Sequence, residues 1–104
     1  DGKREYFVRE LLDSVALHHE GKKMRHCVGS YAWSCQRREA AIFSLTLLQG
    51  HSLSRLITIE VQLGTKTVVQ ARGRCNKPPK PDERRVLGLW AQQAGVKLSQ
   101  WLYE

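Results

Sequence analysis

The pattern of apolar and polar positions changes period along this chain, from helical spacing to strict alternation. Between residues 4 and 20 an i, i+3, i+4 stripe predicts a helix, and Gly21 is predicted to end it. A connector follows at residues 22–24, and a short second helix is predicted from about Cys27 or Gly29 to Arg38. The stripe consists of Tyr6, Phe7, Glu10, Leu11, Ser14, Val15 and Leu17.

Alternating positions in the middle of the chain predict three strands. Residues 42–48 form the first, and the polar stretch 49–52 closes it. Residues 56–63 form the second and residues 67–72 the third, joined by a hairpin loop at 64–66. In the second strand Ile57, Ile59, Val61 and Leu63 are expected to face inward, and Thr58, Glu60 and Gln62 outward.

The register of this hairpin follows from its apolar positions. A three-residue loop places Leu63 opposite Thr67, Val61 opposite Val69 and Ile59 opposite Ala71, so apolar side chains meet on one face. On the other face, Glu60 then lies opposite Gln70 and Thr58 opposite Arg72. Gln70 and Arg72 are therefore expected to point away from the core, beside Glu60.

Prolines separate the strands from a C-terminal helix. Pro78, Pro79 and Pro81 prevent regular structure and stiffen the loop. Asp82 is the expected N-cap of a helix over residues 83–94, which Gly95 ends. Its apolar side holds Val86, Leu87, Trp90 and Ala94, and the tail 96–102 is expected to dock as a last strand or turn of helix. The predicted fold is α+β: N-terminal helices, a three-stranded antiparallel meander and a C-terminal helix packed on the sheet.

The length and the cysteines set the class of protein. We expect residues 1–104 to form a single domain, a piece of a longer chain, since there is no initiator Met. No run approaches the ~20 apolar residues of a membrane helix, and no signal peptide is recognisable, so no membrane partner is expected. Three cysteines, an odd number, indicate reduced thiols and a cytoplasmic location.

The net charge of +7 is concentrated in two blocks. Residues 21–38 and 66–85 each carry a net +5, and the remainder is acidic. Such clustering favours a polyanionic partner, nucleic acid above all, although basic residues also serve solubility. The expected phosphate-binding residues are Lys22, Lys23, Arg25, Arg72, Arg74, Lys77, Lys80, Arg84 and Arg85.

A reactive motif, His26-Cys27-Val28-Gly29-Ser30-Tyr31, lies in the first block. If a helix begins near Cys27, its dipole and neighbouring cations favour the thiolate, which would make a nucleophile. His26 has the pKa range for proton transfer near neutral pH, and Tyr31 could present its hydroxyl in the same pocket. A buried cysteine, a phosphate-binding histidine and a core tyrosine are the alternative interpretations.

A second polar motif, Gln70-x-Arg72-Gly73-x-x-Asn76, lies in the second block. Gln70 and Arg72 share one strand face, and Arg72 could hold a phosphate or carboxylate by two hydrogen bonds. Gly73 allows a sharp turn or a close backbone approach, and Asn76 lies in the proline loop. The candidate catalytic set is His26, Cys27, Tyr31, Gln70, Arg72 and Asn76.

No metal site and no cofactor are predicted. His26, Cys27, Cys35 and Cys75 lack the paired spacing of structural zinc ligands. Phosphate loops, dinucleotide fingerprints and paired catalytic carboxylates are also missing from the sequence. Acidic residues are scarce in both motifs, which argues against a two-metal nuclease.

These motifs, in this order, resemble the PcfJ-like family. The resemblance rests on KMRHCVGSY at residues 23–31, IFSL at 42–45, TIEV at 58–61 and VQARGRCNKPP at 69–79, followed by a helix with Trp90-Ala91. It covers about residues 20–95. The segment 34–39 departs from it, because a glycine-containing turn is expected there. The resemblance implies a protein of conjugative plasmids or phages in the bacterial cytoplasm, with this unit near the C-terminal end of a longer chain. It implies no established reaction.

Three functions remain open at this point. The first is a basic domain that binds DNA or RNA for a mobile element, with His26, Gln70, Arg72 and Asn76 at the contact. The second is an enzyme acting on a nucleotide or nucleic acid, with His26 as acid or base, Cys27 as nucleophile or pocket wall, and Arg72 and Asn76 holding the anion. The third is an interaction module that binds an acidic protein partner.

Overall fold

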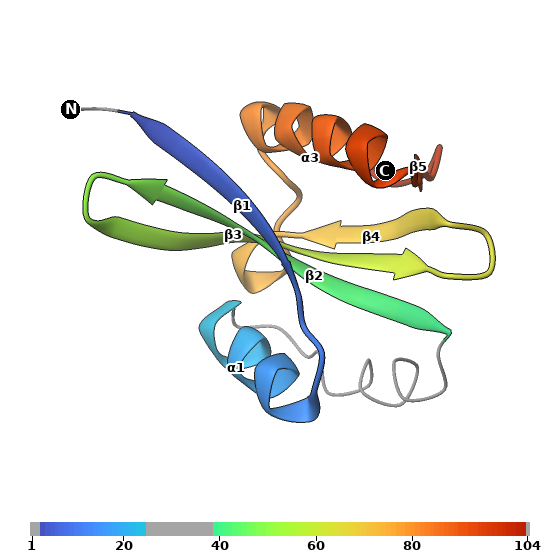
Figure 1. Ribbon diagram of the computed structural model, residues 1–104, viewed down its shortest axis with the longest axis horizontal. Coiled ribbons are helices and arrows are strands. Elements are labelled where there is room, and N and C mark those ends of the chain that lie inside the picture. The colour runs from blue at the N-terminus through green and yellow to red at the C-terminus, as the bar shows by residue number, and fades with distance from the viewer. Residues whose placement is uncertain (1–2, 25–38, 104) are drawn as a thin grey trace.

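A five-stranded sheet with a helix on each face organises the chain (Figure 1). The computed structural model describes residues 3–24 and 39–103. The elements are β1 (Arg4–Glu10), α1 (Ser14–Met24), β2 (Ala40–Gln49), β3 (Ser52–Gln62), β4 (Thr67–Arg72), η1 (Arg74–Asn76), α3 (Pro81–Ala94) and β5 (Lys97–Leu98). The strands lie side by side in chain order, β1-β2-β3-β4-β5.

The expected antiparallel meander forms the centre of this sheet. β2, β3 and β4 pair antiparallel in sequence order, so this part of the α+β prediction is confirmed. The expectation of three strands was incomplete. β1 adds antiparallel to β2 at one edge, and β5 adds parallel to β4 at the other.

The N-terminal segment differs most from the expectation. The helix predicted over residues 4–20 was wrong for residues 4–10, which form β1. Seven residues that alternate in burial suit an edge strand, and hydrogen bonds to β2 outweigh a weak helical stripe. Helix α1 begins at Ser14, where the Asp13 carboxylate accepts the Ala16 N–H at 2.8 Å. Gly21 does not end it, because α1 continues to Met24, whose side chain is buried.

The β3–β4 register agrees with the expectation at one end and not at the other. Ile59 lies opposite Ala71, Glu60 opposite Gln70 and Thr58 opposite Arg72, as predicted. A bulge between Glu60 and Val61 then shifts the pairing, so that Val61 lies opposite Val68 and not Val69. The hairpin loop consequently has four residues, 63–66, and Leu63 and Val69 are exposed.

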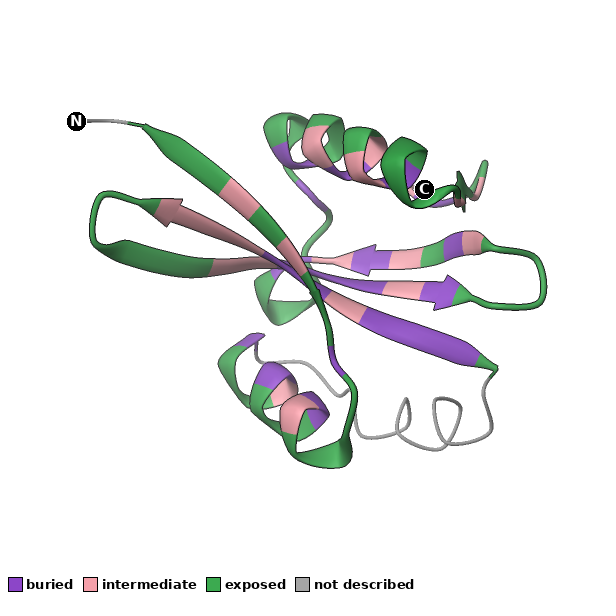
Figure 2. Cartoon of the chain, viewed as in Figure 1, coloured by how far each residue is buried: buried purple, intermediate pink, exposed green. Residues whose placement is uncertain are grey.

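The main core lies between the sheet and α3. Leu45, Ile57, Ile59, Val61, Val68 and Ala71 pack there with Leu87 of α3 and Leu102 of the tail. The Phe43 and Trp90 rings meet with their centroids 4.9 Å apart, which adds an aromatic contact across the two layers. Figure 2 shows this buried band along the middle of the sheet and the facing side of α3.

Helix α1 covers the opposite face of the sheet, which carries the strand positions predicted to face outward. Leu17 packs with Leu11 and Ile42 in a small second core. Thr58, predicted to face outward, does lie on that face but is buried at 4% exposure. The helix supplies its own polar partner there, the fully buried Glu20. Alternation in a strand separates the two faces of a sheet, but it cannot tell whether a helix covers the polar one.

The C-terminal elements follow the prediction with small differences. Asp82 is not the N-cap, because Pro81 takes the first helical position and the Glu83 carboxylate accepts the Lys80 N–H at 2.9 Å. Gly95, at φ 73°, ends α3 as expected. Ala94 is exposed, and Ala91 is the alanine buried on the sheet side of α3. Neither α1 nor α3, the α-helices of the described residues, has the length and apolarity needed to cross a membrane.

Candidate nucleic-acid interface

The first predicted motif falls outside the described residues. Arg25, His26, Cys27 and Tyr31 lie in the segment 25–38, as do the predicted second helix and Cys35. The enzyme hypothesis requires His26 to lie near Gln70, and His26 is outside the described residues. Lys22 and Lys23 are described, and both are exposed in the last turn of α1, where cations complement the helix dipole.

The second motif begins on the face of the sheet that α1 covers. Gln70 and Arg72 point to that face from β4, each half-buried, opposite Glu60 and Thr58 of β3. Burial raises the pKa of Glu60 above its ordinary value. The motif therefore places an amide and a guanidinium near a carboxylate that retains its proton more readily than usual, in two residue pairs that are neighbours on this face of the sheet.

A tight turn follows directly and explains Gly73. The Gly73 N–H donates to the Lys77 carbonyl at 2.7 Å, and the Lys77 N–H donates back to the Arg74 carbonyl at 3.3 Å. A Cβ on Gly73 would lie 3.2 Å from the Lys77 carbonyl oxygen and 3.4 Å from that of Leu56. The glycine is therefore needed for a close backbone approach, one of its two predicted roles.

The two residues at the tip of this turn have left-handed backbones. Cys75 has φ 59° and Asn76 φ 62°, as the central residues of a type I′ turn require. Asparagine tolerates this conformation and cysteine does so less readily. Both are exposed, so the turn presents the Asn76 amide and the Cys75 thiol to solvent, flanked by Arg74 and Lys77.

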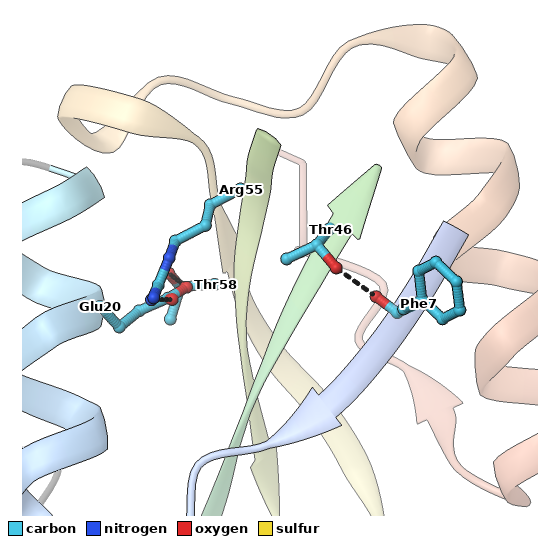
Figure 3. A network of polar contacts seen from close by, with 5 residues as sticks. All are labelled: Phe7, Glu20, Thr46, Arg55 and Thr58. Atoms are coloured by element: carbon cyan, nitrogen blue, oxygen red, sulfur yellow. Dashed lines mark hydrogen bonds and ion pairs between the residues drawn. The ribbon is translucent and has the colours of Figure 1, made fainter. Parts of the chain in front are cut away.

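A buried ion pair anchors α1 to the sheet beside this turn (Figure 3). Arg55 Nη1 of β3 donates to Glu20 Oε1 at 2.7 Å, and the Thr58 hydroxyl donates to Glu20 Oε2 at 2.5 Å. Glu20 is fully buried, whereas the Arg55 side chain keeps 26% of its surface exposed. Arg55 thus neutralises Glu20 with one side of its guanidinium and reaches solvent with the rest.

A pocket of about 460 Å³ opens at the exposed side of Arg55. Arg9 enters it from β1, Lys23 from the end of α1 and Arg74 from η1, and no acidic residue lines it. Arg9, Lys23 and Arg74 make no ion pair with another described residue. The remaining walls are Phe7, Met24, Thr46, Leu53 and Ser54.

A second pocket, of about 510 Å³, shares Arg55 and Arg74 with the first. It extends along the proline loop past Lys77 to Lys80. Its acidic member, Glu83, is buried and already accepts the Lys80 N–H. We call the two pockets together the basic surface, defined by Arg9, Lys23, Arg55, Arg74, Lys77 and Lys80.

The structure separates two of the predicted cations, Arg84 and Arg85, from this surface. Arg84 lies on α3, where its guanidinium stacks over the Tyr103 ring at 4.3 Å and donates to the Pro79 carbonyl at 3.2 Å. Arg85 is exposed on the same helix, and neither residue lines the two pockets. The basic block 66–85 is therefore divided between the two pockets and the surface of α3.

Two members of the basic surface, Arg9 and Arg55, were missed from the sequence. Both lie in strands outside the basic blocks, among neighbours of mixed polarity. Arg55 carried a faint signal, since it interrupts a β-branched and leucine-rich strand. No clusters of three or more His, Cys, Asp or Glu side chains suited to a metal ion occur within residues 3–24 and 39–103.

Comparison with known proteins identifies the family. The model of the PcfJ-like protein family matches residues 3–87, which include β1 to β4, the turn at Gly73 and the start of α3. The chain belongs to the PcfJ-like family. The match extends the resemblance of the motifs to the N-terminal strand and helix. No curated protein and no solved structure matches this PcfJ-like chain.

Proposed function

We propose that this PcfJ-like domain binds nucleic acid of a mobile element through the basic surface. The observation that carries the proposal is the convergence of six cations from separate elements on two adjoining pockets. The nearby acids, Glu20 and Glu83, are buried and engaged in hydrogen bonds, so they offset the surface charge only in part. Phosphates spaced along a strand could occupy such a line of cations, each releasing condensed counterions.

The exposed apolar residues that line the first pocket favour a single strand as the ligand. Phe7 and Leu53, with 47% and 68% of their surfaces exposed, line the pocket beside its cations. An exposed ring next to a charged groove suits a splayed base, which a single strand can offer and a duplex cannot. DNA and RNA remain equal candidates, because both offer phosphates and stackable bases.

Fluorescence anisotropy across a salt series tests the proposal. Labelled single strands and duplexes of DNA and RNA are titrated with wild type, Arg74→Ala, Lys77→Ala and the matched control Arg85→Ala, which removes the same charge outside the pockets. Removing one phosphate contact should lower the slope of log K against log salt by about 1. Arg72→Ala tests the adjoining motif in the same way.

Three results would count against the proposal. Absence of binding at about 150 mM salt, where non-specific binders retain measurable affinity, would exclude it. Equal losses of affinity for Arg85→Ala and Arg74→Ala would show that binding depends on the net charge of the domain and not on the pockets. Tighter binding of polyglutamate than of any nucleic acid would instead favour an acidic protein partner.

A second candidate function, cleavage of a nucleotide or nucleic acid, is favoured by Glu60. Its raised pKa suits a general acid, and Gln70 and Arg72 lie on the same face to orient an anionic substrate. His26 and Cys27 are the further proposed participants. Shortened probe with wild type, lost with Glu60→Gln and with His26→Ala but retained with Cys27→Ser, would assign acid–base cleavage without a cysteine nucleophile.

A further inference from the structure

Strand β1 leaves one side of the sheet unpaired. It is hydrogen-bonded to β2 along seven residues without a register shift, and no described strand lies on its other side (Figure 1). The Leu11 N–H donates to the Ile42 carbonyl, so by alternation the backbone groups of Arg4, Tyr6, Val8 and Glu10 point to the open side. Such an edge can accept another strand.

The side chains of this edge are self-complementary. The strand reads Arg-Glu-Tyr-Phe-Val-Arg-Glu from residue 4 to residue 10. If two copies pair antiparallel about Phe7, Arg4 lies opposite the second copy's Glu10, and Glu5 opposite its Arg9. Tyr6 then lies opposite Val8, and the two Phe7 residues meet at the centre. Opposite charges directly across a strand pair stabilise it, and like charges destabilise it.

This register is favoured over its alternatives. Moving the centre by one residue, to Tyr6, places Glu5 opposite Phe7 and Arg4 opposite Val8, so the ion pairs are lost. A parallel alignment in register places each charged residue next to the same residue of the other copy, so that like charges meet. Mixed charges on an edge strand also serve to prevent non-specific pairing, but a protective pattern needs no order of signs. Here the order of signs selects one partner, a second copy of the chain.

From this we propose that two copies of this domain associate through β1, so that their two five-stranded sheets form one continuous sheet. The two-fold axis runs perpendicular to the sheet at Phe7, so both α1-covered faces lie on the same side. The exposed Phe7 ring, on that same face, packs against its copy. A seven-residue edge buries little area, so the dimer is weak and concentration-dependent. The inference goes beyond nucleic-acid binding and does not rest on it. Phe7 and Arg9 line the first pocket as well, so a second copy and a nucleic acid would compete for these two side chains.

Charge reversal at one pair gives the first test. In the paired strands, residue 5 of each copy faces residue 9 of the other. Glu5→Arg therefore sets two arginines against each other at two places in the dimer, and Arg9→Glu sets two glutamates against each other at the same places. We expect each single variant to raise the dimer dissociation constant by about tenfold or more.

Mixing the two variants should restore association as a heterodimer, as should combining both changes in one chain, because each restores opposite charges across the pair. Arg85→Glu, at an exposed position on α3, is the matched control and should dimerise like wild type. Failure of the mixed variants to associate would overturn the register.

Sedimentation velocity up to about 1 mM protein measures the association, since even a Kd of ~1 mM gives a large dimer fraction there. Circular dichroism verifies that each variant is folded. A monomeric wild type at that concentration would overturn the proposal, and so would single variants that dimerise as well as wild type. Nucleic-acid binding is scored separately with Glu5→Arg, which leaves every cation of the basic surface in place.

A disulfide gives the second test. Opposed residues of a non-hydrogen-bonded antiparallel pair have Cα atoms about 4.5 Å apart, within the range of a disulfide. In a Cys75→Ser background, Phe7→Cys should give a covalent dimer on mild oxidation. Leu53→Cys, which is also exposed, should remain at the baseline of the background protein. Equal cross-linking of both variants would contradict pairing centred on residue 7.

Discussion

Glu20 and Arg55 are 35 residues apart in the sequence and form the ion pair that joins α1 to the sheet, with 2.7 Å between Glu20 Oε1 and Arg55 Nη1. The carboxylate is fully buried and the guanidinium partly exposed at the junction of the two basic pockets. One contact therefore serves two purposes. It holds α1 in place and it presents a cation to the basic surface.

Arg55→Ala should destabilise the fold by about 3 kcal/mol, because it leaves a buried carboxylate without its cation. Urea unfolding monitored by circular dichroism measures the loss. The double variant Glu20→Leu/Arg55→Leu should recover a large part of it, since no charge is then buried. A loss below about 1 kcal/mol for Arg55→Ala would show that the pair behaves as an exposed one.

Glu60 should make the fold less stable as pH rises. Its folded pKa lies above the ordinary value of 4.5 because of burial, so the unfolded chain releases this proton at lower pH than the folded one. The resulting stability is present below pH 4.5 and is lost as pH rises through the folded pKa. Glu60→Gln removes this dependence and should raise the free energy of unfolding at neutral pH. Urea titrations at acidic and neutral pH test this, and an equal effect of the variant at both would contradict it.

Gly73→Ala should cost about 1–3 kcal/mol, because the new methyl group meets two backbone carbonyl oxygens that cannot move without opening the turn. Thermal unfolding measures the cost. Gly64→Ala is the matched control, since its Cβ meets nothing within 4 Å, and it should change stability by less than about 0.5 kcal/mol. Equal effects of the two changes would show that the close approach at Gly73 is not limiting.

Tyr103→Phe should leave stability unchanged or raise it by about 1 kcal/mol. The Tyr103 hydroxyl is buried with no hydrogen-bond partner among the described residues, and burial raises the pKa of this phenol, with Arg84 acting in the opposite direction. Phenylalanine keeps the ring over which the Arg84 guanidinium stacks. Denaturant melts compare the variants, and a loss above about 1 kcal/mol would indicate a hydroxyl partner.

The ends of secondary-structure elements could be predicted from the sequence where neighbouring residues determine them. The strand Thr67–Arg72 was predicted with its observed ends, because its β-branched residues lie between the turn glycines Gly64 and Gly73. Its buried positions were predicted only in part, since the bulge buries Val68 in place of Val69. The end of α3 was predictable because Gly95, a glycine, adopts the left-handed conformation that ends a helix. Residues 4–10 were not, since an isolated seven-residue segment has no strong preference, and pairing with a distant strand determines its state.

Only some of the cations in the candidate site could likewise be grouped from the sequence. The cations of η1 and the proline loop are adjacent in the sequence, so Arg74, Lys77 and Lys80 could be grouped before any fold was known. Arg9 and Arg55 join them only when β1 and β3 are placed in one sheet beside α1. Distances between residues far apart in the chain are set by topology, which charge counting along the sequence does not contain.

The sequence by itself determined the antiparallel meander, the C-terminal helix, the glycine in the turn and the excess of positive charge, because each depends on residues within one segment. Only the tertiary structure decided that α1 covers the polar face of the sheet, that Glu20 is buried against Arg55 and that β1 forms an edge. The physical reason is common to all three. Burial and pairing depend on which segments meet, and that choice minimises the free energy of the whole chain, not of any one segment.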